Sequence, residues 1–288
     1  MTDVIDATPD LLSAVDKLGR DVRSAGALVG RDEARELVAL YYELQEHRIA
    51  LNNQARSLAA AERPTAIVDH FARQIGALEK QMVSVLDVFS MSQTAGEWAR
   101  AQLGVGPVLA AGLLAHIDIE RAPTVGHIWR FAGLDPTKKW GKGERRPWNA
   151  ELKVLCWKLG DSFVKVSGRE NAFYGRMYRE RKQYELTRDG RDVDGKVIGP
   201  ASEHNQRTAF ETLEQRKITD AATRAIYESG HLPVGRLDLR ARRWAVKLFL
   251  SHLHHVMYQD RYGEPPPKPY ILTPEGGHAH YIAPPSFG

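Results

Sequence analysis

The segment at residues 135–149, DPTKKWGKGERRPWN, places basic and aromatic side chains next to one another, and its glycines and prolines keep it from forming a helix. Ammonium and guanidinium groups pair with phosphates, and indole rings stack on exposed bases. The pattern therefore indicates contact with a nucleic acid, and a solvated surface loop is the alternative. The residues that would make this contact are Lys138, Lys139, Trp140, Lys142, Arg145 and Arg146.

A second candidate phosphate contact is the turn LGVGP at residues 103–107, between two short stretches predicted to be helical. Glycine lets the backbone adopt a positive φ and approach a ligand closely, and N–H groups at the start of a helix attract an anion. With Ala110 four positions after the second glycine, this is the helix-hairpin-helix pattern. A tight corner between two helices is the alternative. The contact residues would be Gly104, Val105, Gly106 and Val108.

Further cations lie on two predicted helices, at residues 170–187 and 236–263. Basic side chains on a helix face can pair with phosphates without reading the base sequence. We therefore include them in the predicted nucleic-acid surface. They are Arg176, Arg240, Arg242 and Arg243.

Histidines near the C-terminus raise the question of a metal site. The pairs are His252 and His255 on a predicted helix, and His278 and His280 in the segment GHAHY. Imidazole binds zinc, copper and nickel, but the spacing matches neither the H-E-x-x-H motif nor a zinc finger. Structural or surface histidines are thus the preferred interpretation, and a metal-dependent enzyme is an alternative. The sequence shows no Walker, G-x-S-x-G or dinucleotide-binding motif, so no cofactor is expected.

The elements that must carry these residues are helices. Two long segments, 32–62 and 65–91, have apolar residues at steps of three and four, and Pro64 separates them. This spacing predicts the seam of a coiled coil folded into a hairpin. A single hairpin buries little apolar surface, so we expect a homodimer; packing against the chain's own C-terminal half is the alternative. The seam residues are Leu37, Leu40, Tyr41, Leu44, Leu51, Ala55 and Leu58, then Ile67, Phe71, Ile75, Leu78, Met82, Val85 and Phe89.

The sequence therefore predicts an all-α protein in three parts. Residues 1–91 form the dimerising helical hairpin, residues 92–263 form a domain that contains the helix-hairpin-helix, and residues 264–288 form a proline-rich tail. A coiled-coil assembly protein, whose basic half serves only solubility, is an alternative function.

Charge is distributed unevenly along the 288 residues, whose formal net charge is +4. Residues 1–91 hold 10 Lys/Arg against 14 Asp/Glu, a net charge of −4, and the remaining residues hold 30 against 22, a net charge of +8. Such asymmetry favours a nucleic-acid partner for the second part. Cys156 is the single cysteine, which excludes an internal disulfide, and no apolar run is long enough to cross a membrane. We expect a cytoplasmic protein.

The order of motifs resembles the C-terminal half of bridge-RNA-type insertion-sequence transposases. The segments that carry the resemblance are GVGPVLAAGLLAHI, WRFAGLDP, YGRMYRERK and RARRWAVKLFL, within about residues 95–258. The resemblance implies a helix-hairpin-helix domain preceded by a coiled coil. It also implies DNA as the partner, with structured RNA as an alternative through the family's guide RNA.

Two departures from the family pattern bear on activity. Members of the family begin with an RNase-H-like domain that holds metal ions through four acidic residues, whereas residues 1–91 show no strand periodicity. The family also places a serine nucleophile before a glycine in its second half, where this chain has Trp140 and Gly141; Thr137 lies too early to replace it. We therefore expect a transposase-derived nucleic-acid-binding protein without recombinase activity.

Overall fold

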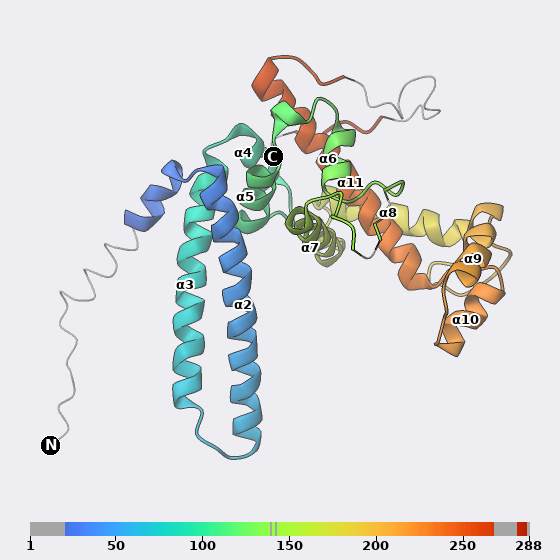
Figure 1. Cartoon of the computed structure of the whole chain (residues 1–288), viewed down its shortest axis with the longest axis horizontal. Helices are drawn as coiled ribbons and strands as arrows, with labels where there is room; N and C mark the ends of the chain where they lie inside the picture. The colour runs from blue at the N-terminus through green and yellow to red at the C-terminus, as the bar shows by residue number, and fades with distance from the viewer. Residues whose placement is uncertain (1–20, 139, 142, 268–280, 287–288) are drawn as a thin grey trace. The chain divides into compact units, whose positions relative to one another are not determined.

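A computed structural model describes residues 21–138, 140–141, 143–267 and 281–286. Within these ranges the regular elements are helices, and the one β-type pairing is an isolated bridge between Arg191 and Val197 (Figure 1). The predicted all-α class is thus confirmed. The chain forms two compact units, the first from residues up to Ala101 with Gly106–Arg121, and the second from Gln102–Val105 with Ala122–Ser286.

The first unit is built on an antiparallel helical hairpin. Its elements are η1 (Gly26–Leu28), α2 (Arg31–Ala60), α3 (Ala66–Met91), α4 (Thr94–Ala101), α5 (Pro107–His116) and η2 (Ile119–Arg121). Arg48 of α2 donates hydrogen bonds of 2.6 and 3.1 Å to the carboxylate of Glu79 on α3. Glu79 is only 6% exposed. Breaking such a pair would leave a charge largely removed from water, so it favours this register of the two helices.

The predicted seam is partly wrong, at Leu40 of α2, which is 44% exposed, and along α3. Ile67, Phe71 and Leu78 are 71%, 57% and 44% exposed, so these three side chains lie outside the hairpin contact. The α3 side that faces α2 here carries Gly76 and Glu79, both next to Arg48. Hydrophobic spacing alone misses a contact made by a glycine and an ion pair.

The apolar helix α5 forms much of the core of the first unit, in contact with both α2 and α3. Pro107 occupies its first turn, where the missing N–H has no cost. Arg31, at the start of α2, donates a 2.7 Å hydrogen bond to the carbonyl of Ile117 just after α5. The first unit therefore extends beyond the boundary at residue 91 that the sequence indicates.

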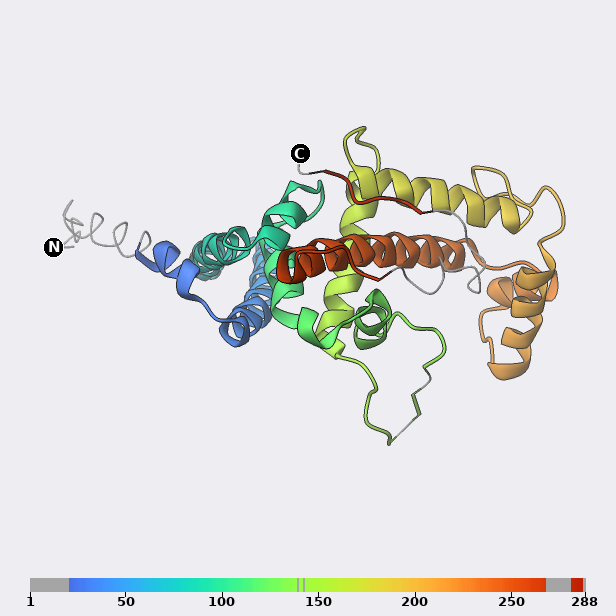
Figure 2. The same cartoon turned by 90° about the horizontal axis from the view of Figure 1, so that it is seen from above.

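The second unit packs its helices around one long helix. Its elements are α6 (Val125–Phe131), α7 (Ala150–Val166), α8 (Phe173–Arg188), α9 (Glu203–Gln215), α10 (Ala221–Glu228) and α11 (Val234–Tyr262). Helix α11 lies beside α8 and also contacts α6 and α7 (Figure 2). Phe163, Tyr174 and Phe249 stack where α7, α8 and α11 meet, with ring centroids 5.0–5.7 Å apart. These aromatic contacts form the centre of the core.

A smaller apolar cluster lies where α9 and α10 join the rest of the second unit. It contains Leu186, Ala209, Tyr227, Leu232 and Leu237. Of the helices in the described ranges, none is both long and apolar enough to span a bilayer.

Candidate nucleic-acid interface

The basic segment between α6 and α7 is a loop whose two ends are fixed by packing. Gly133 has φ +65°, and a Cβ there would lie 2.9 Å from the ring of Trp148. The backbone N–H of Asn149 donates a 2.9 Å hydrogen bond to the carbonyl of Phe131. The Asn149 side chain also accepts the N–H of Leu152 at 2.7 Å, which caps α7. The loop therefore leaves and rejoins the helices at defined points.

Contacts within the loop combine aromatic rings with cations. The indole N–H of Trp140 donates to the carbonyl of Glu144 at 2.6 Å, and the ring meets Trp148 edge-to-face at 6.4 Å between centroids. The guanidinium of Arg146 lies 5.0 Å from the ring centre of Trp140, and the Lys153 ammonium lies 4.1 Å from that of Trp148. Trp140 nevertheless remains 43% exposed, so indole surface is available for stacking.

Asp135 lies near several cations at the start of the loop. It accepts hydrogen bonds from the backbone and hydroxyl of Thr137, at 2.9 and 2.8 Å, and these bonds lower the pKa of the Asp135 carboxyl. The charges of Lys138 and Arg130 lower this pKa further. One carboxylate thus faces cations from both α6 and the loop.

Helix α11 adds two cations to this neighbourhood. The Lys247 ammonium lies 4.1 Å from the ring centre of Trp129, whose indole N–H donates to the Lys247 carbonyl at 3.1 Å. Burial lowers the pKa of Lys247; Asp135 raises it and Arg243 lowers it. Arg243 itself is exposed. The structure therefore brings a predicted residue of α11 into the same neighbourhood as the predicted loop.

Sequence reasoning missed several members of this surface. Arg130, Lys153 and Lys247 belong to it through the contacts above, and Trp157 on α7 is 59% exposed, one helical turn after Lys153. The signal for Trp157 was present, because it falls outside the α7 stripe of buried residues, which are Leu152, Leu155, Cys156, Leu159, Gly160 and Phe163.

Burial raises the pKa of the Cys156 thiol to about 12, so this cysteine belongs to the core.

The two glycines of the 103–107 turn differ in their surroundings. Gly104 has φ +100°, and a Cβ there would lie 3.2–3.5 Å from side-chain atoms of Val166, Ser162 and Phe163 on α7. Gly106 has φ −83° and ψ 171°, and a Cβ there would meet nothing within 4 Å. Gly104 is therefore the residue that the corner requires, and Gly106 is the one with open space around it.

The valines of the turn do not present side chains to a ligand. Val105 and Val108 are 3% and 8% exposed, and the Val105 N–H donates to the carbonyl of Gln102 at 3.0 Å. Both side chains pack as core, and the predicted contact is one of backbone N–H groups, of which that of Val105 is already engaged. The N–H of Val108 lies in the first turn of α5, where no helical carbonyl can accept it.

Gly104 and the basic loop lie at opposite ends of α7. The loop enters α7 at Asn149, whereas Gly104 packs on Ser162 and Val166. At a rise of 1.5 Å per residue, these positions are about 20–25 Å apart along the helix. The structure thus does not combine Gly104 and the loop into one site.

The other predicted arginines have different environments. Arg242 pairs with Asp238 at 2.6 Å and Asp161 at 3.3 Å, so its charge is used between α11 and α7. Arg176 is exposed and lies 3.8 Å from Glu180. Because two carboxylates already hold Arg242, it is left out of the surface proposed below.

The predicted histidine His252 is part of the packing of the second unit. His252 is 2% exposed; its Nε2 donates to the carbonyl of Ile282 at 2.8 Å and its Nδ1 accepts from the hydroxyl of Tyr174 at 2.7 Å. With both ring nitrogens engaged, His252 cannot ligate a metal in this arrangement. His255 is half-buried on the same helix. Lys139, Lys142, His278 and His280 lie outside the described residues.

In comparisons with known proteins, no protein-family model matches the chain, and no curated protein or solved structure matches it. What this surface can bind is therefore inferred from its own residues.

Proposed function

We propose that the second unit binds nucleic acid through a surface, here called the loop surface, on α6, the 133–149 loop, α7 and α11. Its residues are Arg130, Lys138, Trp140, Arg145, Arg146, Trp148, Lys153, Trp157 and Arg243. The observation that carries the proposal is the exposed indole of Trp140, held by Glu144 and flanked by the Arg146 guanidinium. Cations beside exposed aromatic rings suit a phosphate backbone with accessible bases.

The chemistry of the loop surface favours contact without base readout. Lysine and arginine side chains pair with phosphates whatever the sequence, and stacking accepts every base. Trp140 and Trp157 can stack only on bases that are not inside a duplex. The expected ligand is therefore DNA with unpaired bases, and structured RNA with unpaired loops shares this chemistry.

The binding experiment compares three labelled probes by fluorescence anisotropy: single-stranded DNA, duplex DNA of the same sequence, and an RNA hairpin. We expect the two probes with unpaired bases to bind more tightly than the duplex. Replacing Trp140 with alanine should weaken binding of those two probes by about tenfold, since base–aromatic stacking contributes about 1–3 kcal/mol per base. Tyr262→Ala, which removes another exposed aromatic ring, is the matched control. Failure of all three probes to bind would refute the proposal.

We propose further that this function is derived from that of a transposase. The segments that resemble insertion-sequence transposases include the 103–107 turn and the start of the loop, and Trp140–Gly141 stands where that family has its serine nucleophile. Trp140 has no hydroxyl to attack a phosphodiester, and its indole suits stacking. We therefore propose that the protein binds nucleic acid without catalysing strand exchange.

A second proposed function is self-association through α3. Ile67, Phe71 and Leu78 are spaced by four and seven residues, which places them on one face of the helix. All three remain exposed within the hairpin. A second copy of this face would cover these side chains, as a parallel or antiparallel helix pair does in coiled coils. A protein that serves only in assembly would use the same face of α3. The binding experiment above distinguishes the two functions, because an assembly protein would bind none of the nucleic-acid probes.

A further inference from the structure

A second group of cations lies where α8 ends and α9 begins. Burial lowers the pKa of His204, and the neighbouring charges of Arg188, Arg240 and Arg207 lower it further. The N–H of Ser202, the residue that caps α9, donates to the carbonyl of Arg188 at 2.9 Å. The charges of three guanidinium groups thus act on one imidazole; we call Arg188, His204, Arg207 and Arg240 the α8–α9 cluster.

The carboxylate next to Arg240 is already paired. Glu185 is 2% exposed and accepts hydrogen bonds of 2.9 and 2.7 Å from Arg181, while Arg240 lies 3.6 Å from its other oxygen. The side chains of Arg188 and Arg207 make no hydrogen bond or ion pair with any residue in the described ranges. Two guanidinium groups of the cluster, those of Arg188 and Arg207, are therefore without a partner among the described residues.

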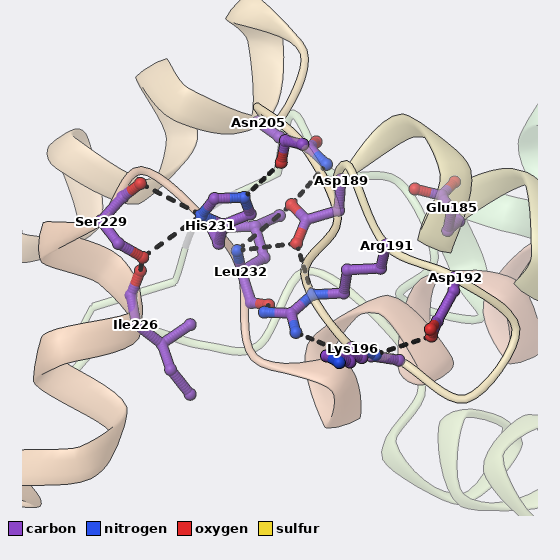
Figure 3. Close-up of polar contacts among 12 residues, drawn as sticks. Glu185, Asp189, Arg191, Asp192, Lys196, Asn205, Ile226, Ser229, His231 and Leu232 are labelled. Carbon is purple, nitrogen blue, oxygen red and sulfur yellow. Dashed lines mark hydrogen bonds and ion pairs between the residues drawn. The ribbon is translucent and has the colours of Figure 1, made fainter.

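A buried polar network holds the cluster in place. Asp189, which is fully buried, accepts the side-chain amide of Asn205 at 2.9 Å, the Arg191 guanidinium at 2.9 Å and the N–H of Leu232 at 3.2 Å (Figure 3). Asn205 in turn accepts a 2.8 Å hydrogen bond from Arg240. Because the network links α8, α9 and α11, the guanidinium of Arg240 is positioned before any ligand arrives.

Helix α11 connects the cluster with the loop surface. Arg236, Arg240, Arg243 and Lys247 occupy positions i, i+4, i+7 and i+11, which share one face of a helix. Arg236 and Arg188 both lower the pKa of Arg240, beyond the effect of burial, while Glu185 raises it. Arg243 likewise lowers the pKa of Lys247. Cations thus follow α11 from one surface to the other over about 10–16 Å.

We propose that Arg188, His204, Arg207 and Arg240 bind backbone phosphates of the same nucleic acid that occupies the loop surface, so that the strand follows the cationic face of α11. This inference rests on the proposed function. Charge complementarity supports it, because guanidinium groups pair with phosphates, and those of Arg188 and Arg207 have no hydrogen-bond or ion-pair partner among the described residues. The α8–α9 cluster has no tryptophan, tyrosine or phenylalanine among its members, so its main contribution would be to position the strand through phosphate contacts.

The test measures the affinity of the Arg188→Gln/Arg207→Gln variant for single-stranded DNA of about 6 nucleotides, which fits within one single-strand binding site, and of about 20 nucleotides, which exceeds it. We expect affinity for the longer strand to fall about tenfold and its salt dependence to decrease by about 1–2 units of slope. Binding of the short strand, which the loop surface can hold alone, should not change. The control Arg216→Gln/Arg224→Gln removes the same charge from exposed positions near α10.

The outcomes separate this inference from the proposed function. If the Arg188→Gln/Arg207→Gln variant binds the long strand as the wild type does, while Arg145→Gln/Arg146→Gln weakens it, the cluster inference is overturned and the proposed function stands. If the wild type binds neither strand, both are overturned. A second readout is the imidazole proton resonance of His204, whose pKa should rise when the long strand binds, because a phosphate stabilises the imidazolium. No change of that pKa in the complex would also overturn the inference.

Discussion

The hydroxyl of Ser162 donates a 2.5 Å hydrogen bond to the backbone carbonyl of Gly104, 58 residues earlier in the chain. This contact holds the turn of residues 102–105 against α7, at a glycine whose backbone takes a positive φ that L side chains rarely adopt. The sharp turn therefore requires glycine at position 104. An anion that contacts this turn would meet the backbone around Gly106, where the space is open.

The two glycines should consequently respond differently to substitution. Gly104→Ala is expected to lower the unfolding free energy by about 1–2 kcal/mol, the cost of a side chain in the left-handed region, because its Cβ also presses on Val166. Gly106→Val should fold like the wild type, since its φ and ψ are ordinary for any residue and its Cβ position is open. Thermal unfolding of both variants checks this expectation.

Gly106→Val also tests the phosphate contact. A branched side chain at the start of α5 would block the approach of a phosphate to the N–H groups of its first turn. We expect weaker nucleic-acid binding at moderate salt with unchanged unfolding. Equal affinity of the folded variant and the wild type would mean that the turn is only a corner between helices.

Protonation of His252 should destabilise the protein in mild acid. Burial lowers its pKa from 6.5 to about 4, because the folded site holds the neutral ring between Tyr174 and Ile282. The unfolded chain binds this proton at a higher pH, so the stabilisation is complete above about pH 6.5 and is lost as the pH falls toward 4. At 1.36 kcal/mol per pKa unit, the effect is on the order of 3 kcal/mol.

Chemical denaturation at several pH values measures this effect. The wild type should lose unfolding free energy between pH 6.5 and 4 more steeply than His252→Gln, which has no titrating ring at this position. Parallel pH profiles of the two proteins would show that His252 does not contribute to the pH dependence. The buried neighbour His254, whose pKa is also lowered by burial, is present in both proteins and cancels in the comparison.

Self-association is expected to depend on the exposed face of α3. Leu78→Asp should convert a dimer to a monomer without unfolding the chain, because Leu78 is 44% exposed within one copy and a buried unpaired carboxylate costs several kcal/mol in a dimer. Multi-angle light scattering of the full chain measures the mass. Leu28→Asp, at a position that is 88% exposed outside this face, is the control. A wild-type monomer at tens of micromolar would contradict the proposal.

The helices could be predicted from the sequence, but the partners of individual charges could not. Arg242 lies among basic residues in the sequence, yet it pairs with Asp161, 81 residues away. Local spacing also placed Ile67 and Phe71 inside the hairpin, whereas the Arg48–Glu79 pair and Gly76 face the partner helix. Contacts between distant segments decide which side chains stay free, and a linear pattern carries no information about them.

Cleavage of DNA is not expected. Supercoiled DNA incubated with the protein and Mg²⁺ or Mn²⁺ should stay intact, because the loop has tryptophan and glycine where the resembling transposases have a serine before their glycine. Gel electrophoresis detects nicking at the level of single breaks. Nicking that persists through purification and disappears on replacing His255 or His278 would instead support a metal-dependent enzyme.

The loop surface is tested most directly by the salt dependence of single-stranded DNA binding in the wild type and in Arg145→Gln/Arg146→Gln. Both arginines are exposed, so the variant should fold normally. Each phosphate contact contributes about 0.7 to the slope of log K against log salt for a single strand, so the slope should fall by about 1.4. The control Arg169→Gln/Arg179→Gln, with the same charge loss at exposed positions, should keep the wild-type slope. Identical slopes and affinities for the wild type and the loop variant would contradict the account.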